Sequence, residues 1–186
     1  MERALVLIKP DGIERALIGN VISKFEISGL KVVGIKMLNA TKEMAGKHYA
    51  EDEEWLTSVG KKMKASYKEK GEEITEPDRA IGMRVRDMLM NELIRVPIIA
   101  MVLEGNAAND VARKIAGSTE PRKADPSTIR GMYSSDTYGL ADKQKRPVRN
   151  IVHVSESKEA AEKEIKVWFK EAEIHKYERA DEAAMY

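Results

Sequence analysis

At 186 residues, 42% of them hydrophobic, the chain can bury one sizeable core, and its length calls for no second full domain. Its 32 Lys and Arg nearly balance its 31 Asp and Glu, so the net charge of +1 excludes the broad attraction to nucleic acid or acidic membranes that a strongly basic chain shows. The lack of cysteine excludes disulfides, thiolate chemistry and the usual structural zinc site.

The apolar runs of the sequence do not match a membrane span or a signal peptide. No apolar run approaches the ~20 residues that span a bilayer. The apolar run at residues 4–8 follows Glu2 and Arg3 and is too short for a signal peptide. We therefore expect a soluble, cytoplasmic protein with no membrane partner.

The amino-terminal segment predicts a strand, a helix and a second strand. The apolar run at residues 4–8 ends in the turn sequence KPDG at 9–12, as a buried strand does. Over residues 18–25 apolar side chains recur with the i, i+3, i+4, i+7 spacing of an amphipathic helix, which Gly29 ends. Residues 31–38 predict the second strand.

The middle of the chain is polar, charged and helical in pattern. We expect two helices on either side of the loop-like sequence GEEITEPD at residues 71–78. A third buried strand is predicted at residues 97–103, and the helix that follows it ends at Gly117.

Residues 117–147 sustain no period, and a loop of about thirty residues in a compact domain is more often functional than filler. Residues 148–154 predict a fourth strand, and residues 161–169 predict the closing helix. The order of these elements is βαββαβ with additions. It predicts an α+β, ferredoxin-like sandwich, in which a four-stranded antiparallel sheet has helices on one face.

Basic side chains stand at two places where an anion could bind. Lys9 ends the first strand beside a fixed turn, although a lysine there could also simply face solvent. Arg113 precedes the long loop, which is rich in Arg, Lys and Thr. Guanidinium groups and hydroxyls can donate hydrogen bonds to phosphate oxygens, so this loop could bind a polyphosphate. The alternative is that these charged side chains simply face solvent. Neither a P-loop nor a Rossmann motif is present, so side chains must hold any phosphate.

A single histidine, His153, ends the fourth strand. Strand alternation places it on the same face as Ile151, opposite the neighbouring valines. The flanking serines, Ser155 and Ser157, predict a helix N-cap, and Glu164 lies far enough into that helix to reach back. A neutral imidazole with one nitrogen fixed by a carboxylate is a nucleophile for phosphoryl transfer; a hydrogen-bonded core histidine is the alternative.

The other two histidines have no setting comparable to that of His153. His48 precedes Tyr49 in a charged, helical stretch, and His175 lies near the carboxyl end. No cluster of Asp or Glu stands at metal-ligand spacing around any of the three histidines. We therefore expect protein side chains to hold no metal ion.

Together these segments resemble the nucleoside diphosphate kinase family. The motifs run in family order up to Trp168: IKPDG at 8–12, IGNVISKFE at 18–26, GLKVVGIKML at 29–38, HYAE at 48–51, VLEGNAA at 102–108, ARKIAGSTEP at 112–121, TIRG at 128–131 and RNIVHVSES at 149–157. The resemblance implies one kinase domain at residues 1–170 with a helical insertion at about 52–86, followed by a charged tail at 171–186.

The resemblance also implies an activity and a set of site residues. The family moves the γ-phosphate of a nucleoside triphosphate, mainly ATP, to a nucleoside diphosphate in a ping-pong cycle that supplies NTPs and dNTPs. His153 matches the histidine that carries the phosphate, Glu164 the carboxylate that orients it, and Tyr49 the tyrosine beside it. The side chains that hold sugar hydroxyls and phosphates are matched by Lys9, Arg113, Thr119, Arg130 and Asn150. Mg²⁺ enters with the nucleotide and bridges its phosphates.

The chain departs from the family pattern where the base should stack. The family's phenylalanine has no match, so Trp55 is the candidate platform, with a core tryptophan as the alternative. Three further positions differ from the family motifs: Glu120 stands where the family has Asn, and Met132 and Glu156 stand where it has Asp. The changes at Glu120 and Met132 put local loop contacts and subunit packing in question. The resemblance further implies a homo-oligomer and favours a hexamer over a tetramer.

Two other functions are weighed. RNA-binding modules also use a four-stranded ferredoxin-like sheet, but they stack bases on exposed aromatic side chains of the sheet. The four predicted strands contain no Phe, Tyr or Trp, so we expect no nucleic-acid partner. A nucleotide-sensing relative that has lost catalysis is disfavoured because His153, Lys9 and the arginines are intact.

Overall fold

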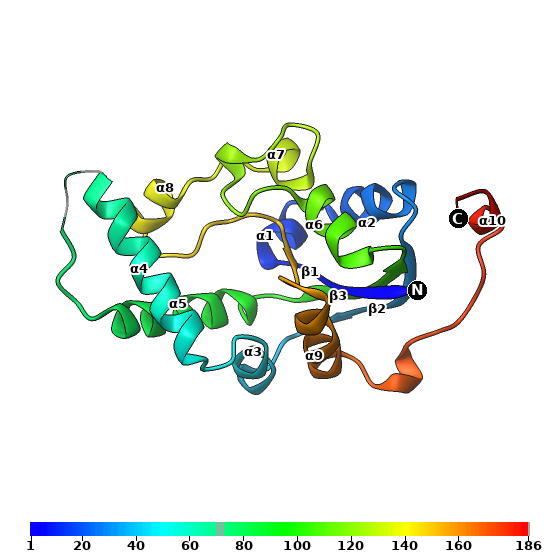
Figure 1. Ribbon diagram of the computed structural model, residues 1–186, viewed down its shortest axis with the longest axis horizontal. Coiled ribbons are helices and arrows are strands. Elements are labelled where there is room, and N and C mark those ends of the chain that lie inside the picture. The colour runs from blue at the N-terminus through cyan, green and yellow to red at the C-terminus, as the bar shows by residue number, and fades with distance from the viewer. Residues whose placement is uncertain (70, 72, 186) are drawn as a thin grey trace.

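The strands form one antiparallel sheet in the order β2-β3-β1-β4 (Figure 1). The computed structural model describes residues 1–69, 71 and 73–185. The strands are β1 (Glu2–Ile8), β2 (Lys31–Leu38), β3 (Ile98–Gly105) and β4 (Val152–Val154). The predicted four-stranded antiparallel sheet of a ferredoxin-like fold is confirmed.

The helices follow the predicted order, with short ones added. They are α1 (Pro10–Glu14), α2 (Ile18–Ile27), α3 (Lys42–His48), α4 (Glu53–Glu69), α5 (Asp78–Leu93), α6 (Ala108–Ala116), α7 (Ile129–Tyr133), α8 (Tyr138–Lys143), α9 (Lys158–Trp168) and α10 (Glu182–Met185). Helices α4 and α5 are the two predicted around residues 71–78; residues 70 and 72 of that insertion, and residue 186 of the tail, lie outside the described residues. Within the described chain, no helix is long and apolar enough to cross a membrane.

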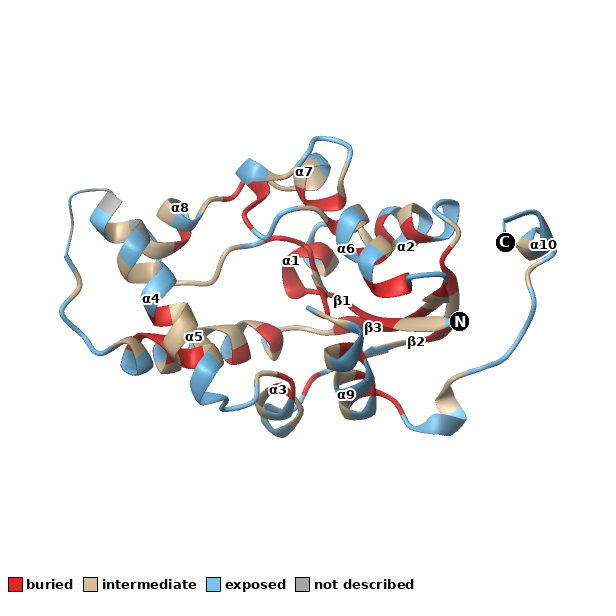
Figure 2. Cartoon of the chain, in the orientation of Figure 1, coloured by how far each residue is buried: buried red, intermediate tan, exposed pale blue. Residues whose placement is uncertain are grey.

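Helices cover both faces of the sheet (Figures 1 and 2). Val6 and Ile8 of β1 pack in a core with α2 and α6, whereas Leu5 and Leu7 pack in a second core with α3, α5 and α9. A strand buried on both faces has a continuous apolar run, and β1 has one. The prediction of helices on one face only is therefore wrong, and among the described residues neither sheet face is open to the base stacking of an RNA-binding module.

Strand β4 is shorter than predicted, since it spans Val152–Val154 rather than residues 148–154. Ile151 adopts a φ of +69° and packs in the same core as the two valines, so its predicted place on the face of His153 is wrong. Two hydrogen bonds bend the chain there: the Lys9 amide donates to the Ile151 carbonyl at 2.8 Å, and the Ile151 amide donates to Asp11 at 2.8 Å. His153 follows this bend, opposite Leu7 in the ladder, and faces α3 and α9.

The tail returns along the outer edge strand β2. The His175 amide donates to the Val33 carbonyl at 2.7 Å, and Lys31 lies 3.3 Å from Glu182. In Figure 1 the tail reaches α10 beyond the end of α2. These contacts cover part of the edge strand, while Ile35 and Met37 of β2 stay exposed.

Candidate active site

One cavity of about 750 Å³ brings the predicted site residues together. Its walls come from the end of β1, from α3 to α6, from the long loop, and from β4 and α9. The cavity is lined by all of the residues that the resemblance singles out: Lys9, Tyr49, Trp55, Arg113, Thr119, Arg130, Asn150, His153 and Glu164. Residues up to 155 positions apart in the sequence thus meet at one site because the sheet and helices converge there.

His153 and Glu164 both line this cavity and contact each other. Nε2 of His153 lies 2.9 Å from Oε2 of Glu164. Burial favours the neutral form of Glu164, but hydrogen bonds and charge from His153 outweigh it and lower the pKa of the carboxyl. Because an ionised carboxylate only accepts hydrogen bonds, Nε2 of His153 carries the proton. The other ring nitrogen, Nδ1, then keeps its lone pair.

Helix α9 delivers Glu164 to the histidine. Ser157 caps the helix, since its hydroxyl accepts a hydrogen bond from the Ala160 amide at 3.2 Å. The prediction that Ser155 also serves as a cap is wrong: Ser155 is buried, and its hydroxyl donates to Oε2 of Glu164 at 2.6 Å. Ser155 therefore fixes the carboxylate, a role that its position two residues after His153 could have suggested.

His48 joins the site, contrary to the expectation that it has no comparable setting. It ends α3, and its ring lies 4.4 Å from that of His153, at an interplanar angle of 80°. Ligand-type atoms of His48, His153 and Glu164 all lie within 4.8 Å of one another, so His48 joins the expected pair of His153 and Glu164. The one sequence signal for His48 was its place directly before Tyr49.

Cationic side chains line the cavity beside His153. Lys9 is buried and donates to Asn150 Oδ1 at 2.9 Å; burial lowers its pKa. Arg130 donates to the carbonyl of Val152 at 2.9 Å, and burial lowers its pKa to about 10, so it stays protonated at neutral pH. Arg113 donates to the Ser155 carbonyl at 3.3 Å. These three cations and His153 line the same cavity.

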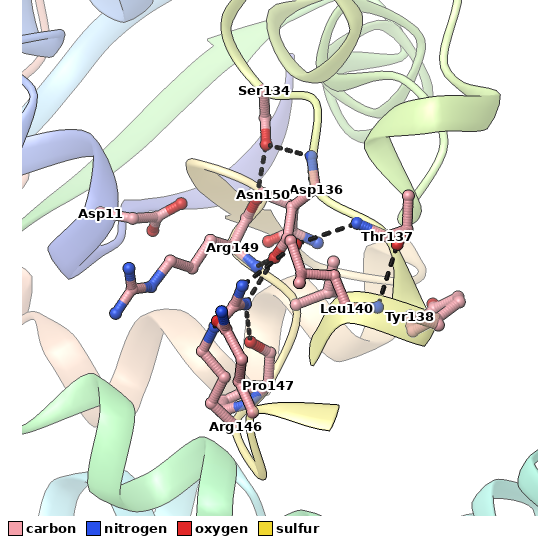
Figure 3. Close-up of polar contacts among 12 residues, drawn as sticks. Asp11, Ser134, Asp136, Thr137, Tyr138, Leu140, Arg146, Pro147, Arg149 and Asn150 are labelled. Carbon is pink, nitrogen blue, oxygen red and sulfur yellow. Dashed lines mark hydrogen bonds and ion pairs between the residues drawn. The ribbon is translucent and has the colours of Figure 1, made fainter. Parts of the chain in front are cut away.

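The loop before β4 is anchored by Asp136 (Figure 3). Arg146 donates to Asp136 at 2.5 and 3.1 Å, and the Arg149 amide donates to it at 2.7 Å. Burial favours the neutral form of Asp136, but these hydrogen bonds lower its pKa. The anchor holds the next residue, Asn150, which donates to the Thr119 carbonyl at 2.9 Å and accepts from Lys9.

Helices α4 and α5 also contribute to the wall of the cavity. Trp55 near the start of α4 is partly exposed and lines the cavity, whereas the core tryptophan of the chain is Trp168, which is 2% exposed. Leu89 of α5 lines the cavity beside it. Arg86 of α5 donates to the Tyr49 carbonyl at 2.6 Å and so ties the insertion to α3.

Two of the residues that depart from the family pattern lie away from this cavity. Glu120 is buried in the long loop, where it accepts a hydrogen bond from the Tyr138 amide at 3.3 Å and contacts Lys123 at 3.1 Å. Met132 is exposed and lines a separate cavity of about 530 Å³. Both therefore concern loop contacts and not the lining of the cavity.

Comparisons with known proteins agree with this arrangement. The family model for nucleoside diphosphate kinase matches residues 2–58 and 82–174, and the unmatched segment lies inside the predicted insertion. A nucleoside diphosphate kinase of Pyrobaculum aerophilum is 41% identical over 179 residues, which cover 94% of this chain and 98% of the relative. One of Pyrococcus abyssi is 41% identical and covers 97% of this chain and 92% of its own length.

Solved structures are similar as well. The crystal structure of an NDP kinase from Pyrobaculum aerophilum has a TM-score of 0.91 and 39% identity, covering 94% of this chain and 99% of that one. A transition-state mimic of nucleoside-diphosphate kinase from Borrelia burgdorferi, with bound vanadate and ADP, has a TM-score of 0.80 and 32% identity, covering 98% and 95%. The chain therefore belongs to the nucleoside diphosphate kinase family of phosphotransferases.

Proposed function

We propose that this enzyme transfers the γ-phosphate of a nucleoside triphosphate, mainly ATP, to a nucleoside diphosphate through a phosphohistidine on His153. The observation that carries the proposal is the hydrogen bond between Nε2 of His153 and Glu164, which leaves Nδ1 unprotonated beside Lys9, Arg113 and Arg130. Phosphoryl transfer depends mainly on positioning and on neutralising charge, and this cavity supplies both.

Each half-reaction is a displacement at phosphorus. First, the Nδ1 lone pair of His153 bonds to the γ-phosphorus while the bond to the bridging oxygen breaks, and the diphosphate leaves. The proton on Nε2 stays in place, so the phosphorylated ring gains a positive charge that the Glu164 carboxylate stabilises. In the second half, a terminal oxygen of the acceptor diphosphate attacks the same phosphorus, the N–P bond breaks, and the neutral imidazole returns.

The other lining residues hold the nucleotide in this proposal. Lys9, Arg113 and Arg130 now donate to neutral oxygens, and phosphate oxygens would be stronger acceptors for the same groups. Arriving phosphate also favours the charged form of Lys9. Thr119 and Asn150 offer neutral contacts to phosphates and sugar hydroxyls, Tyr49 borders the histidine, and Trp55 stacks the base.

We also propose that Mg²⁺ arrives on the nucleotide. Among the described residues, the group suited to hold a metal consists of two histidines and one glutamate, whereas Mg²⁺ prefers oxygen ligands. Phosphate oxygens meet that preference, and the ion supplies further charge neutralisation there.

Two further properties stay predictions. Exposed apolar side chains on β2 and on the long loop support a homo-oligomer, for which a hexamer is favoured over a tetramer, and the light-scattering mass in solution tests this. The cytoplasmic location rests on the sequence and is tested by fractionation of the source cells.

A labelling experiment tests the assignment of the nucleophile. Incubation with γ-labelled ATP and Mg²⁺ should leave one acid-labile, base-stable phosphate on the protein, and excess diphosphate should remove it. His153→Ala should abolish the label, while the matched control His175→Ala, at an exposed tail position, should keep it. Label that persists in His153→Ala would reject His153 as the nucleophile.

A further inference from the structure

His48 is the buried histidine of the site that the proposed reaction does not use. Its side chain is 0% exposed, and it contacts the rings of Tyr49, His153 and Trp168 at centroid distances of 4.7, 4.4 and 5.5 Å. These neighbours are Tyr49, which directly follows α3, His153 in β4 and Trp168 in α9. A side chain enclosed in this way next to the nucleophile can control its orientation.

Trp168 determines which nitrogen of His48 carries the proton. The indole N–H of Trp168 donates to Nδ1 of His48 at 3.3 Å. Because an indole nitrogen only donates, Nδ1 must hold the lone pair, and a neutral His48 must then carry its proton on Nε2. Nε2 has no hydrogen-bond partner among the described residues, so Trp168 alone sets this tautomer.

The charge of His48 is suppressed as well. Burial, and then the charge of His153, lower the pKa of His48 to about 3, against the opposing effect of Glu164. The titratable groups that face it are Tyr49, which directly follows α3, His153 from β4 and Glu164 from α9. His48 is therefore a neutral ring over the pH range in which a histidine nucleophile works.

The same hydrogen bonds argue against a metal at this cluster. The lone pair of His48 is taken by Trp168, and its other nitrogen is protonated. Oε2 of Glu164 already accepts hydrogen bonds from both His153 and Ser155. A metal would have to break these bonds, so the cluster is a hydrogen-bonded unit.

We infer that His48 is a positioning residue for His153, and that Trp168 keeps it from competing for Glu164. Nδ1 of His48 lies 4.0 Å from Oε2 of Glu164, a small movement short of a hydrogen bond. If Nδ1 carried a proton, it would donate to that oxygen and draw the carboxylate away from His153. With Trp168 in place Nδ1 has no proton to donate, and the perpendicular ring of His48 only packs against His153. This inference rests on the proposed role of His153.

The tautomer can be measured without any assay of activity. In protein labelled with ¹⁵N-histidine, the three histidines are assigned with the variants His48→Phe and His175→Gln. We expect His48 to give the nitrogen shifts of a neutral, Nε2-protonated ring from about pH 8 to about pH 5. A His48 that titrates in this range, or that carries its proton on Nδ1, would overturn the inference.

A rescue experiment tests the competition for Glu164. Trp168→Phe should slow phosphohistidine formation by about tenfold or more, because His48 is then free to donate to Glu164. Adding His48→Phe should restore most of the rate, since two apolar rings cannot compete for the carboxylate. If Trp168 acted only through packing, the double variant would be as slow as the single one or slower.

A matched control separates packing from chemistry. Phe169→Leu removes packing from the next core residue but does not touch His48, so its label should form at close to the wild-type rate. If wild-type protein takes up no label, the proposed function fails. If wild-type protein is labelled but His48→Phe gives no rescue, the proposed function stands and this inference fails.

Discussion

Oε2 of Glu164 lies 2.9 Å from Nε2 of His153 and 2.6 Å from Oγ of Ser155, so one carboxylate oxygen receives two donors. This oxygen fixes both the position and the tautomer of the imidazole. The nitrogen left with a lone pair is the one that the proposed reaction requires. In the proposed reaction, the orientation of Glu164 therefore decides which nitrogen of His153 can attack phosphorus.

Glu164→Gln should slow phosphohistidine formation by about 100-fold while ATP still binds. The neutral amide cannot stabilise the positive charge of the phosphorylated ring, and it can turn its NH₂ toward the histidine. Rapid-quench labelling measures the rate, and calorimetry measures ATP binding. The control Glu162→Gln makes the same change on the exposed side of α9 and should keep the wild-type rate. A full rate in Glu164→Gln would remove the proposed role of this residue.

Asp136→Asn should reduce the free energy of unfolding by about 2–3 kcal/mol at pH 7, because the side chain loses its negative charge and one of the two oxygens that accept from Arg146 and the Arg149 amide. The folded pKa of Asp136 is lowered, so its stabilisation is present above the unfolded pKa of about 3.9 and is lost as pH falls through the lower folded value. Urea unfolding at pH 7 and at pH 3 should therefore give a smaller difference between wild type and variant at pH 3.

The exposed Asp87→Asn serves as control for Asp136→Asn and should change the free energy of unfolding by no more than about 0.5 kcal/mol at either pH. A loss in Asp136→Asn that stays the same at both pH values would show that the ionised carboxylate is not what anchors the loop.

Gly60→Ala and Gly82→Ala should each reduce the free energy of unfolding by about 1–3 kcal/mol. A Cβ at Gly60 would lie 2.1 Å from the carbonyl oxygen of Asp78, and one at Gly82 would lie 2.2 Å from that of Leu56. Helices α4 and α5 would have to separate, which moves Trp55 and raises the KM for nucleotide. Gly19→Ala in α2, where a Cβ meets nothing within 4 Å, should not destabilise the protein. If the three substitutions reduced the free energy of unfolding equally, the close approach of α4 and α5 would not be the cause.

Trp55→Ala should weaken nucleotide binding by about 1–3 kcal/mol, the range for loss of base stacking on an aromatic ring. The loss should be similar for purine and pyrimidine nucleotides, because stacking requires only the face of the base. Trp55→Phe should retain most of the affinity. Titration of the diphosphates by calorimetry tests this, and an unchanged affinity in Trp55→Ala would place the base elsewhere.

Much of the site could be expected from the sequence because its residues sit at the ends of recognisable elements. Lys9 follows an apolar run, and His153 lies in a short strand just before a capped helix. His48 and Ser155 were missed as site residues for a physical reason: their contacts with Trp168 and Glu164 depend on side-chain directions in space, which no period in the chain reports.

By itself, the sequence determined the order of strands and helices and the family, since apolar periods, turn residues and motifs are local patterns. Only the tertiary structure decided that helices cover both faces of the sheet, that Ile151 leaves the strand with a positive φ, and that His48 contacts His153. Those features arise from packing between segments far apart in the chain, where the position of each side chain depends on all of its neighbours at once.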